Sequence, residues 1–596
     1  MDNPSGSQKK NIYQVFTRLF GNTNTNNIPW GTLQENGVGK FSDFSIKALN
    51  EIKNLGITHI WYTGVLQHAT VTDYTQFGID RDDPRIVKGR AGSPYAIKDY
   101  YNVNPDLANN PADRLQEFKE LISRTHSVGL KVIIDLVPNH VARNYNAQTN
   151  PGRVGNFGED DNHSVAYSPN NNFYYDPEST FKPLHDHEEY KPLGNYKFPK
   201  LATDFVEIPA KWTGNGSRST QPQFHDWFET VKINYGISPE GRKDFKELPR
   251  DYNTKTYSEH YHFWESHVVP DSWVKFRDIS KYWLEMGVDG FRYDMAEMVP
   301  VEFWSYLNSF IKTNYPGTIL IAEVYNPTLY RDYIFQGQMD YLYNKVQLYD
   351  TLRDIIQNAS STDAIQTVEN ELHDIAPYML NFLENHDEQR IASPEFAGNP
   401  EKGKPAMVVA ATISSAPTLI YFGQEVGEPA VEDAGFGKPS RTSIFDYVGV
   451  PSLQRWVNDK KFDGGKSTVE ELQLREFYSN LLNFTLKSPA ILGKYYGLHH
   501  YNLEHSENYG DRLFSFSRWT KDEKLIIVVN FSDYQNANFK LKLPRDLISQ
   551  WDSQQENYIL VDQLNNTYQT QLKLKEGMAE TAIELKPLES FILKIM

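Results

Sequence analysis

Four stretches of this chain combine an apolar, strand-like run with ionisable side chains at its end. They are Asp135-Leu-Val-Pro-Asn-His140, Gly290-Phe-Arg-Tyr-Asp294, Ile319-Leu-Ile-Ala-Glu323 and Asn381-Phe-Leu-Glu-Asn-His-Asp387. A carboxylate at the end of a buried strand is costly unless it is paired or used. The four ends together supply carboxyl groups, histidines and an arginine, which are the side chains of acid–base and nucleophilic chemistry.

Asp294 and Glu323 form the most informative pair among these residues. Hydrolysis of a glycoside with retention needs two carboxyl groups about 5–5.5 Å apart, one a nucleophile and the other an acid. Arg292 and Asp294 occupy positions i and i+2 of a strand and share a face, so Arg292 would keep Asp294 ionised. Glu323, on the next strand, would stay protonated beside a partly apolar wall and the charge of Asp294.

Each of these residues alone also has a plainer interpretation. An Arg-x-Asp on a strand is usually a structural ion pair, and Asp135 would bond loop backbone. Single histidines such as His140 and His386 are more often satisfied polar groups than ligands. The occurrence of all four strand ends in order along the chain favours one common site.

The elements that would position these ends alternate between strand and helix. Strand-like runs lie at 11–20, 57–63, 131–137, 288–293, 318–324, 340–343, 379–383 and 418–422, and helical patterns at 44–55, 113–128, 272–286 and 303–314. About eight such units predict an α/β fold, a (β/α)8 TIM barrel whose active site lies at the C-terminal ends of its strands.

Three other segments break the alternation. Residues 1–10 have the composition of a flexible polar leader, and the barrel would occupy 11–140 and 256–495. Residues 141–255 are rich in Asn, Asp, Pro, Gly and Tyr, and they are too long for a plain loop, so we expect an inserted subdomain after the third strand. Short strands between turns predict a C-terminal antiparallel β-sandwich domain over 496–596.

The four strand ends resemble the four signature regions of the α-amylase superfamily, glycoside hydrolase family thirteen, and the likeness extends over barrel, insertion and C-terminal domain. It implies that Asp294 is the nucleophile, Glu323 the acid/base and Asp387 the third acid, which grips sugar hydroxyls. It also implies a structural role for Asp99. The implied substrate contacts are Tyr95, His140, Arg292, His386, Glu297 and Arg390.

The segments 226–236 and 295–304 are similar to starch-utilisation amylases and neopullulanases of Bacteroidetes. Such enzymes are typically exported, so we expect a periplasmic or secreted protein whose signal is missing from this sequence, with a cytoplasmic location still open. Relatives that dimerise often do so through an extra N-terminal β-domain. The barrel would begin almost at once here, which predicts a monomer.

The chain departs from the family pattern at two places. Many relatives carry Lys-His where this sequence has Glu297-Met298, in a position that faces the leaving-group sugars. An aspartate that often belongs to a calcium site is replaced by Gln223, although Asn139 of that site remains. Because hard cations prefer several oxygens including carboxylates, we expect no required cofactor and no conserved calcium there. The acidic run at 159–161 is better explained as a solvated turn than as an ion site.

Composition limits the classes of partner. The 596 residues carry a net charge of −17, which disfavours nucleic acid and anionic membranes, and no apolar run is long enough to span a bilayer. The sequence contains no cysteine, which excludes disulfides and thiolate metal sites. Aromatic residues make up 14% of the chain, mostly for packing, but some would line a sugar cleft.

These observations predict a retaining endo-type hydrolase of α-1,4-glucosidic bonds in starch-like α-glucans, an α-amylase. A neopullulanase, cyclomaltodextrinase or glucanotransferase would share the same covalent intermediate, so these alternatives stay open. A catalytically inert sugar-binding barrel is the alternative outside enzymes. It is disfavoured because all three acids are present.

Overall fold

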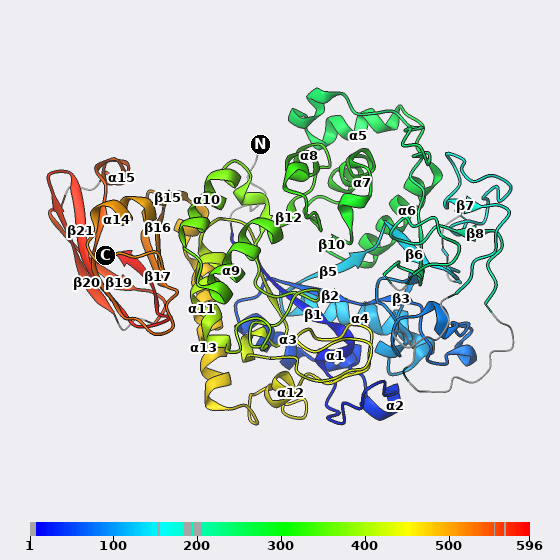
Figure 1. Ribbon diagram of the computed structural model, residues 1–596, viewed down its shortest axis with the longest axis horizontal. Helices are drawn as coiled ribbons and strands as arrows, with labels where there is room; N and C mark the ends of the chain where they lie inside the picture. The colour runs from blue at the N-terminus through cyan, green and yellow to red at the C-terminus, as the bar shows by residue number, and fades with distance from the viewer. Residues whose placement is uncertain are drawn as a thin grey trace.

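Eight parallel strands form the centre of the molecule (Figure 1). Their order is β13-β12-β11-β10-β5-β2-β1-β14, and a parallel bridge between Asn381 and Thr418 joins the two outer strands. The predicted (β/α)8 barrel is therefore confirmed. The strands are β1 Asn11–Phe16, β2 His59–Thr63, β5 Lys131–Leu136, β10 Gly290–Tyr293, β11 Ile319–Ala322, β12 Tyr341–Tyr343, β13 Met379–Leu380 and β14 Thr418–Tyr421.

The computed structural model gives the same alternation of strands and helices that the sequence pattern predicts. Helices follow the strands and surround the barrel, and α6 ends at Gly287 in a left-handed conformation (φ 108°) that favours glycine. The main helices are α3 Ile46–Asn54, α4 Arg114–Ser127, α5 Tyr257–Glu265, α6 Asp271–Met286, α7 Val301–Asn314, α8 Tyr330–Phe335, α9 Asp350–Asn358, α10 Asp363–Leu372, α11 Lys404–Thr412, α12 Pro451–Val457 and α13 Val469–Lys487. The described residues are 8–148, 150–151, 155–183, 194, 205–223, 225–552, 555–565 and 568–596.

Two apolar layers hold the barrel together. Side chains of alternate residues point to opposite sides of a strand, so in β10 Phe291 and Tyr293 pack against the surrounding helices while Arg292 faces the interior. The interior is filled by a separate cluster that includes Ile12, Trp61 and Ile133. A filled interior leaves the strand ends as the place where polar side chains can gather.

The predicted leader and first strand differ from the structure in detail. Residues 1–7 lie outside the described part of the chain, but Lys9 is buried and donates to the Ser414 carbonyl at 3.0 Å. The first strand ends at Phe16, and the short helix α1 (Thr17–Phe20) completes the run that was expected to be strand throughout. A two-stranded antiparallel sheet of β3 (Leu66–His68) and β4 (Ile97–Val103) was not predicted.

Between β5 and α5 the chain forms short strands rather than barrel units. In this inserted region β6 (His140–Ala142) pairs with β9 (Thr230–Lys232), and β7 (Tyr175–Asp176) pairs with β8 (Ala210–Lys211). Because β6 begins four residues after β5 ends, this pairing places part of the insertion directly above the exit of the third barrel strand.

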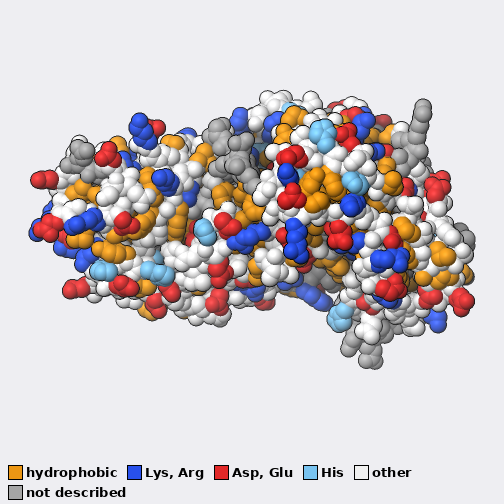
Figure 2. Space-filling model, turned by 90° about the horizontal axis from the view of Figure 1, so that it is seen from above, with side chains coloured by type: hydrophobic (Ala, Val, Ile, Leu, Met, Phe, Trp, Pro, Cys, Tyr) orange, Lys and Arg blue, Asp and Glu red, His pale blue; other side chains and the backbone are white. Residues whose placement is uncertain are grey.

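The C-terminal β-sandwich domain is confirmed as an eight-stranded antiparallel array with its own core around Ile526, Val528 and Leu593. It extends from one side of the barrel, and on the face shown in Figure 2 acidic and basic side chains are interspersed. No helix within the described ranges is long and apolar enough to cross a membrane. The elements are β15 Lys494–Gly497, α14 His499–His505, β16 Leu513–Trp519, β17 Lys524–Asn530, β18 Ala537–Leu543, α15 Arg545–Trp551, β19 Asn557–Asp562, β20 Gln569–Lys575, β21 Met578–Leu585 and β22 Ser590–Ile595.

Candidate active site

Three acids meet in a cavity of about 340 Å³ at the C-terminal ends of the barrel strands. Asp294 directly follows β10 and Glu323 directly follows β11, while Asp387 lies in the loop after β13. The parallel ladder sets the first two at one level, because Tyr293 pairs with Ala322 and the Glu323 N–H donates to the Tyr293 carbonyl at 3.1 Å. The sequence prediction that these strand ends converge agrees with this geometry.

Arg292 holds the acids together. Its Nη1 donates to Asp294 Oδ1 at 2.8 Å, and its Nη2 lies 2.8 Å from Glu323 Oε2. The same guanidinium contacts Asp135 at 3.3 Å, and its Nε donates to the Tyr343 hydroxyl at 3.0 Å. Burial would lower the pKa of Arg292, but the nearby carboxylates, Glu323 first, raise it well above its usual value. The site therefore keeps one permanent positive charge among several carboxyl groups.

The charge state expected for Asp294 is only partly supported. Arg292 acts to lower its pKa, as the sequence suggested, but burial has the larger effect, and the carboxylates of Glu323 and Asp387 act in the same direction as burial. The pKa of Asp294 is consequently raised well above its usual value. One guanidinium does not offset three neighbouring carboxyl groups, so the cluster retains a proton at higher pH than an isolated aspartate does.

Glu323 accepts hydrogen bonds from two donors, whereas a partly apolar wall was expected beside it. Oε1 accepts from the Tyr325 hydroxyl at 2.6 Å, and Oε2 accepts from the Met295 backbone N–H at 2.7 Å. Met295 is a non-glycine residue at φ 46°, a left-handed conformation that is uncommon and costs of order 1–3 kcal/mol. That conformation directs its N–H toward Glu323, which fixes the position of this carboxylate.

Two amide side chains fix the orientation of the two histidines. The Asn139 amide Nδ2 lies 3.0 Å from Nδ1 of His140, and the Gln14 amide Nε2 lies 2.8 Å from Nδ1 of His386. Burial lowers the pKa of His140 to about 3 and that of His386 well below its usual value, so both rings are neutral. Each ring then accepts at Nδ1 and carries its proton on Nε2.

Both Nε2 atoms face the acids. That of His140 lies 4.0 Å from Asp294 Oδ2, and that of His386 lies 3.1 Å from Asp387 Oδ2 and 2.5 Å from the Tyr95 hydroxyl. Tyr95 also lines the cavity, as predicted for a residue that stacks under a sugar. The histidines thus present N–H donors to any hydroxyl group bound beside the carboxylates.

The two further aspartates have structural contacts. Asp135 accepts hydrogen bonds from the Trp61 indole N–H at 2.9 Å and from Arg292. Its partners are therefore side chains, whereas bonds to loop backbone were predicted. Burial raises the pKa of Asp135 to about 6. Asp99 is fully buried and accepts from the backbone N–H of Tyr101 at 2.8 Å, which agrees with the structural role expected for it.

Glu297 and Arg390, which were expected to contact substrate, are not among the residues that line the cavity. The Glu297 carboxylate accepts from the backbone N–H groups of Tyr325 (2.8 Å) and Asn326 (3.0 Å). Arg390 is fully buried, with Nη1 2.9 Å from Glu384 Oε2. Both lie close to site residues along the chain, but their side chains turn toward loop backbone and a buried acid.

Several lining residues were not identified from the sequence. Trp227 packs edge-on against His140 with ring centroids 5.2 Å apart, and Lys88 pairs with the buried Glu229 at 2.8 Å. Tyr325 follows Glu323 by two residues, just past the end of a strand, and this spacing is the one sequence feature that could have identified a lining residue. Lys88, Trp227 and Glu229 come from long loops whose sequences give no position relative to the acids.

No group of three or more His, Asp or Glu side chains that could hold a metal ion occurs in the described ranges. In the acidic run, Asp161 accepts from the backbone N–H groups of Asn172 (2.7 Å) and Phe173 (3.0 Å). Glu159 accepts from the Asn156 N–H at 2.7 Å. These carboxylates organise turns of the inserted region.

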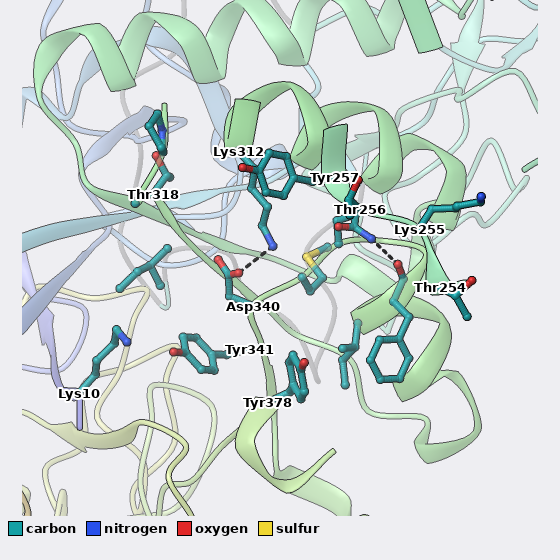
Figure 3. Close-up of a pocket in the computed structure, with 17 residues that line it drawn as sticks. Lys10, Thr254, Lys255, Thr256, Tyr257, Lys312, Thr318, Asp340, Tyr341 and Tyr378 are labelled. Carbon is teal, nitrogen blue, oxygen red and sulfur yellow. Dashed lines mark hydrogen bonds and ion pairs between the residues drawn. The ribbon is translucent and has the colours of Figure 1, made fainter. Parts of the chain in front are cut away.

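A larger cavity of about 750 Å³ lies at the opposite end of the barrel (Figure 3). Lys10, Asp340 and Tyr378 line it and immediately precede β1, β12 and β13. Asp340, the one acid among its described lining residues, is paired with Lys312 at 2.8 Å. Since catalytic groups of such barrels lie at the C-terminal strand ends, we place the active site in the smaller cavity.

Comparison with known proteins finds α-amylase family models over most of the chain. The family model described as "Alpha amylase, catalytic domain" matches residues 14–461, and the model of the α-amylase C-terminal all-β domain matches residues 504–595. Among curated proteins, the chain is 22% identical to α-amylase 3 of Dictyoglomus thermophilum, with 88% of this chain and 85% of the relative covered. It is also 22% identical to a cyclomaltodextrinase of Thermoanaerobacter pseudethanolicus, over 94% and 76% of the two chains.

The fold has solved counterparts. A maltogenic α-amylase of Thermotoga neapolitana superimposes with a TM-score of 0.59 at 18% identity, over 100% of both chains. At this identity the likeness concerns the fold alone.

Proposed function

Because this chain belongs to the α-amylase family, we propose that it hydrolyses α-1,4-glucosidic bonds within starch-like α-glucans and retains the anomeric configuration. The observation that carries this proposal is the attachment of Asp294 and Glu323 to one guanidinium, each through a 2.8 Å contact with Arg292. A shared anchor favours the short separation of about 5–5.5 Å that retaining glycosidases use.

In the proposed reaction Asp294 attacks the anomeric carbon while Glu323 gives a proton to the departing glycosidic oxygen. The products of this step are a glycosyl ester on Asp294 and the released sugar. Glu323 then removes a proton from water, which attacks the same carbon, breaks the ester and restores both carboxyl groups. This sequence of steps requires Glu323 to carry a proton when substrate binds.

The remaining residues would bind the sugar that is cleaved. Asp387 and His140 line the cavity, and Nε2 of His386 lies 3.1 Å from Asp387, so these three side chains suit hydroxyl recognition. Tyr95 offers an aromatic face to the apolar side of a pyranose ring. Hydrogen bonds that strengthen as the ring distorts would lower the barrier to forming the ester.

The proposed preference for starch-like α-1,4-glucans has a close alternative. A neopullulanase, cyclomaltodextrinase or glucanotransferase would form the same ester and differ in substrate shape or in the acceptor that arrives second. One of the relatives described above is named as a cyclomaltodextrinase and another as an α-amylase, so their names do not separate these activities. An inert binding barrel is disfavoured because all three acids line one cavity and Arg292 contacts two of them, Asp294 and Glu323.

Product analysis tests the proposal. The protein is incubated with amylose, pullulan and a cyclodextrin, products are separated by chromatography, and Asp294→Asn serves as the control. Maltose and maltotriose from amylose, with pullulan intact, support α-amylase activity, whereas panose from pullulan supports the neopullulanase alternative. No cleavage of any of the three, or equal activity of the variant, would overturn the proposed mechanism.

A further inference from the structure

Lys232 joins three segments beside the active site. It ends β9 in the inserted region, where it pairs with His140 of β6. Its ammonium donates to Oδ1 of Asn139, at the exit of β5, and to the Met298 carbonyl at 3.1 Å, in the loop after β10. The Lys232 ammonium therefore connects the inserted region to the segments that follow β5 and β10.

The residues around this point do not fit a divalent cation. The α-amylase resemblance implies calcium near Asn139, but the Asn139 carbonyl oxygen already faces the ammonium of Lys232. Gln223, which replaces the expected aspartate, is exposed and uncharged. A divalent cation needs several oxygens, usually including carboxylates, and would be repelled by an ammonium on the same oxygen.

We propose that the Lys232 ammonium takes the place of the family's calcium ion and is a positioning residue that sets which nitrogen of His140 carries the proton. The contacts of Asn139 provide the link. Its carbonyl faces Lys232, which can only donate, and its Nδ2 donates at 3.0 Å to the Gly214 carbonyl, which can only accept. A flipped amide would oppose like groups at both ends.

The fixed amide then dictates the state of the histidine. The second hydrogen of Asn139 Nδ2 points to Nδ1 of His140 at 3.0 Å, so Nδ1 accepts. The proton of the neutral ring must lie on Nε2, which faces Asp294 Oδ2 at 4.0 Å. Loss of the ammonium would leave the Gly214 carbonyl as the remaining contact that orients the amide, and the N–H donor of His140 would be directed less firmly to the bound sugar.

This inference rests on the proposed hydrolysis only for its kinetic readout. The first measurement needs no activity: the thermal midpoint of the wild-type protein with and without EDTA and with added Ca²⁺. We expect both reagents to leave the midpoint unchanged. A midpoint that EDTA lowers by several degrees and Ca²⁺ restores would overturn the replacement of calcium.

Two variants test the positioning role, assayed with EDTA present. Assays are run near pH 6, well below the ordinary pKa of a lysine, so that the ammonium form predominates. Lys232→Met removes the donor at similar length, and we expect kcat to fall about tenfold with a smaller change in KM. Asn139→Asp is the matched variant, because it keeps an oxygen against Lys232 but removes the N–H that faces His140.

We expect Asn139→Asp to remain folded, because its carboxylate pairs with Lys232 although the Gly214 carbonyl loses its donor, and yet to lower kcat at least about tenfold. Wild-type kcat in this folded variant would contradict the positioning role, even if Lys232→Met fails to fold. A wild-type protein that cleaves no glucan would reject the proposed function, while the EDTA and Ca²⁺ measurement would still decide whether Lys232 replaces the metal.

Discussion

Asp294 has two requirements that conflict. A nucleophile must be ionised, but burial and the carboxylates of Glu323 and Asp387 raise the pKa of Asp294 despite the contact with Arg292. Ionising it in this setting costs free energy, which is typical of catalytic groups held close to other charges. The activity should therefore depend on the protonation of Asp294.

We expect kcat/KM to fall as pH decreases through the raised pKa of Asp294, because the protonated acid cannot attack. The acidic limb of the profile should lie clearly above the ordinary aspartate value of about 3.9. The measurement is kcat/KM on a soluble malto-oligosaccharide between pH 3.5 and 8. An acidic limb at the ordinary aspartate value would contradict the charge balance described here.

The loop after β11 positions Glu323 through contacts made between elements. Glu297, from the loop after β10, holds the backbone of Tyr325 and Asn326, and the Tyr325 hydroxyl donates to Glu323. Each hydrogen bond to a charged group contributes about 1.5–3 kcal/mol. The position of the Glu323 carboxylate therefore depends on Glu297, a residue that does not line the cavity.

Glu297→Ala should lower kcat about tenfold or more, because the loop that carries Tyr325 loses both of its carboxylate contacts. Glu297→Gln is the matched control, since it keeps a carbonyl oxygen for the same N–H groups and should retain most of kcat. Steady-state kinetics of both variants is the measurement. If Ala and Gln raise KM equally and leave kcat unchanged, Glu297 binds substrate directly and the positioning role is rejected.

Helices and strands were easier to predict from the sequence than contacts between side chains. The strands β10 and β11 lie in apolar runs that are directly followed by an acid, so these strands and the side chains at their ends were identified directly. Strands such as β20, Gln-Thr-Gln-Leu-Lys-Leu-Lys, carry few apolar residues and were missed. Gln14 reaches His386, and Lys232 reaches Asn139, from distant parts of the chain, and no local pattern marks such contacts.

The direction of the Arg390 side chain could not be predicted from the sequence. Arg390 lies three residues after Asp387, and its place in a motif suggested a contact with substrate. Chain proximity does not fix direction in an irregular loop, and the guanidinium turns inward to pair with the buried Glu384. Such a pair is retained because a buried carboxylate without a partner would be strongly destabilising.

At the scale of the whole molecule, buried charges join the barrel to the C-terminal domain. Arg518 of β16 donates to the Ile413 carbonyl at 3.1 Å, which links the β-sandwich to the segment that follows α11. Glu369 of α10 is buried nearby, and burial raises its pKa to about 8, although Arg518 acts in the opposite direction. The junction therefore prefers the protonated form of this glutamic acid.

This preference predicts how stability changes with pH. The pKa of Glu369 is higher in the folded state than its ordinary value of 4.5, so its contribution is fully present below 4.5 and is lost as pH rises to about 8. Glu369→Gln mimics the protonated acid and should lose less stability over this window. We expect the thermal midpoint of the variant to exceed that of the wild type at pH 8 by about 2–4 °C or more.

The comparison at pH 4.5 is the internal control, because both proteins then carry an uncharged group at position 369 and their midpoints should agree closely. An equal difference between the two proteins at both pH values would contradict the raised pKa.

The central claim is that Asp294 forms a covalent bond with the sugar and that Glu323 serves as acid and base. The most direct measurement uses Glu323→Gln with α-maltosyl fluoride, whose leaving group needs no proton, followed by mass spectrometry of the intact protein and of its peptides. Hydrolysis of the ester is slow without Glu323, so the account predicts a mass increase of one maltosyl group located on Asp294. Attachment to another carboxylate such as Asp387, or fluoride release at a normal rate with no labelled protein, would contradict it.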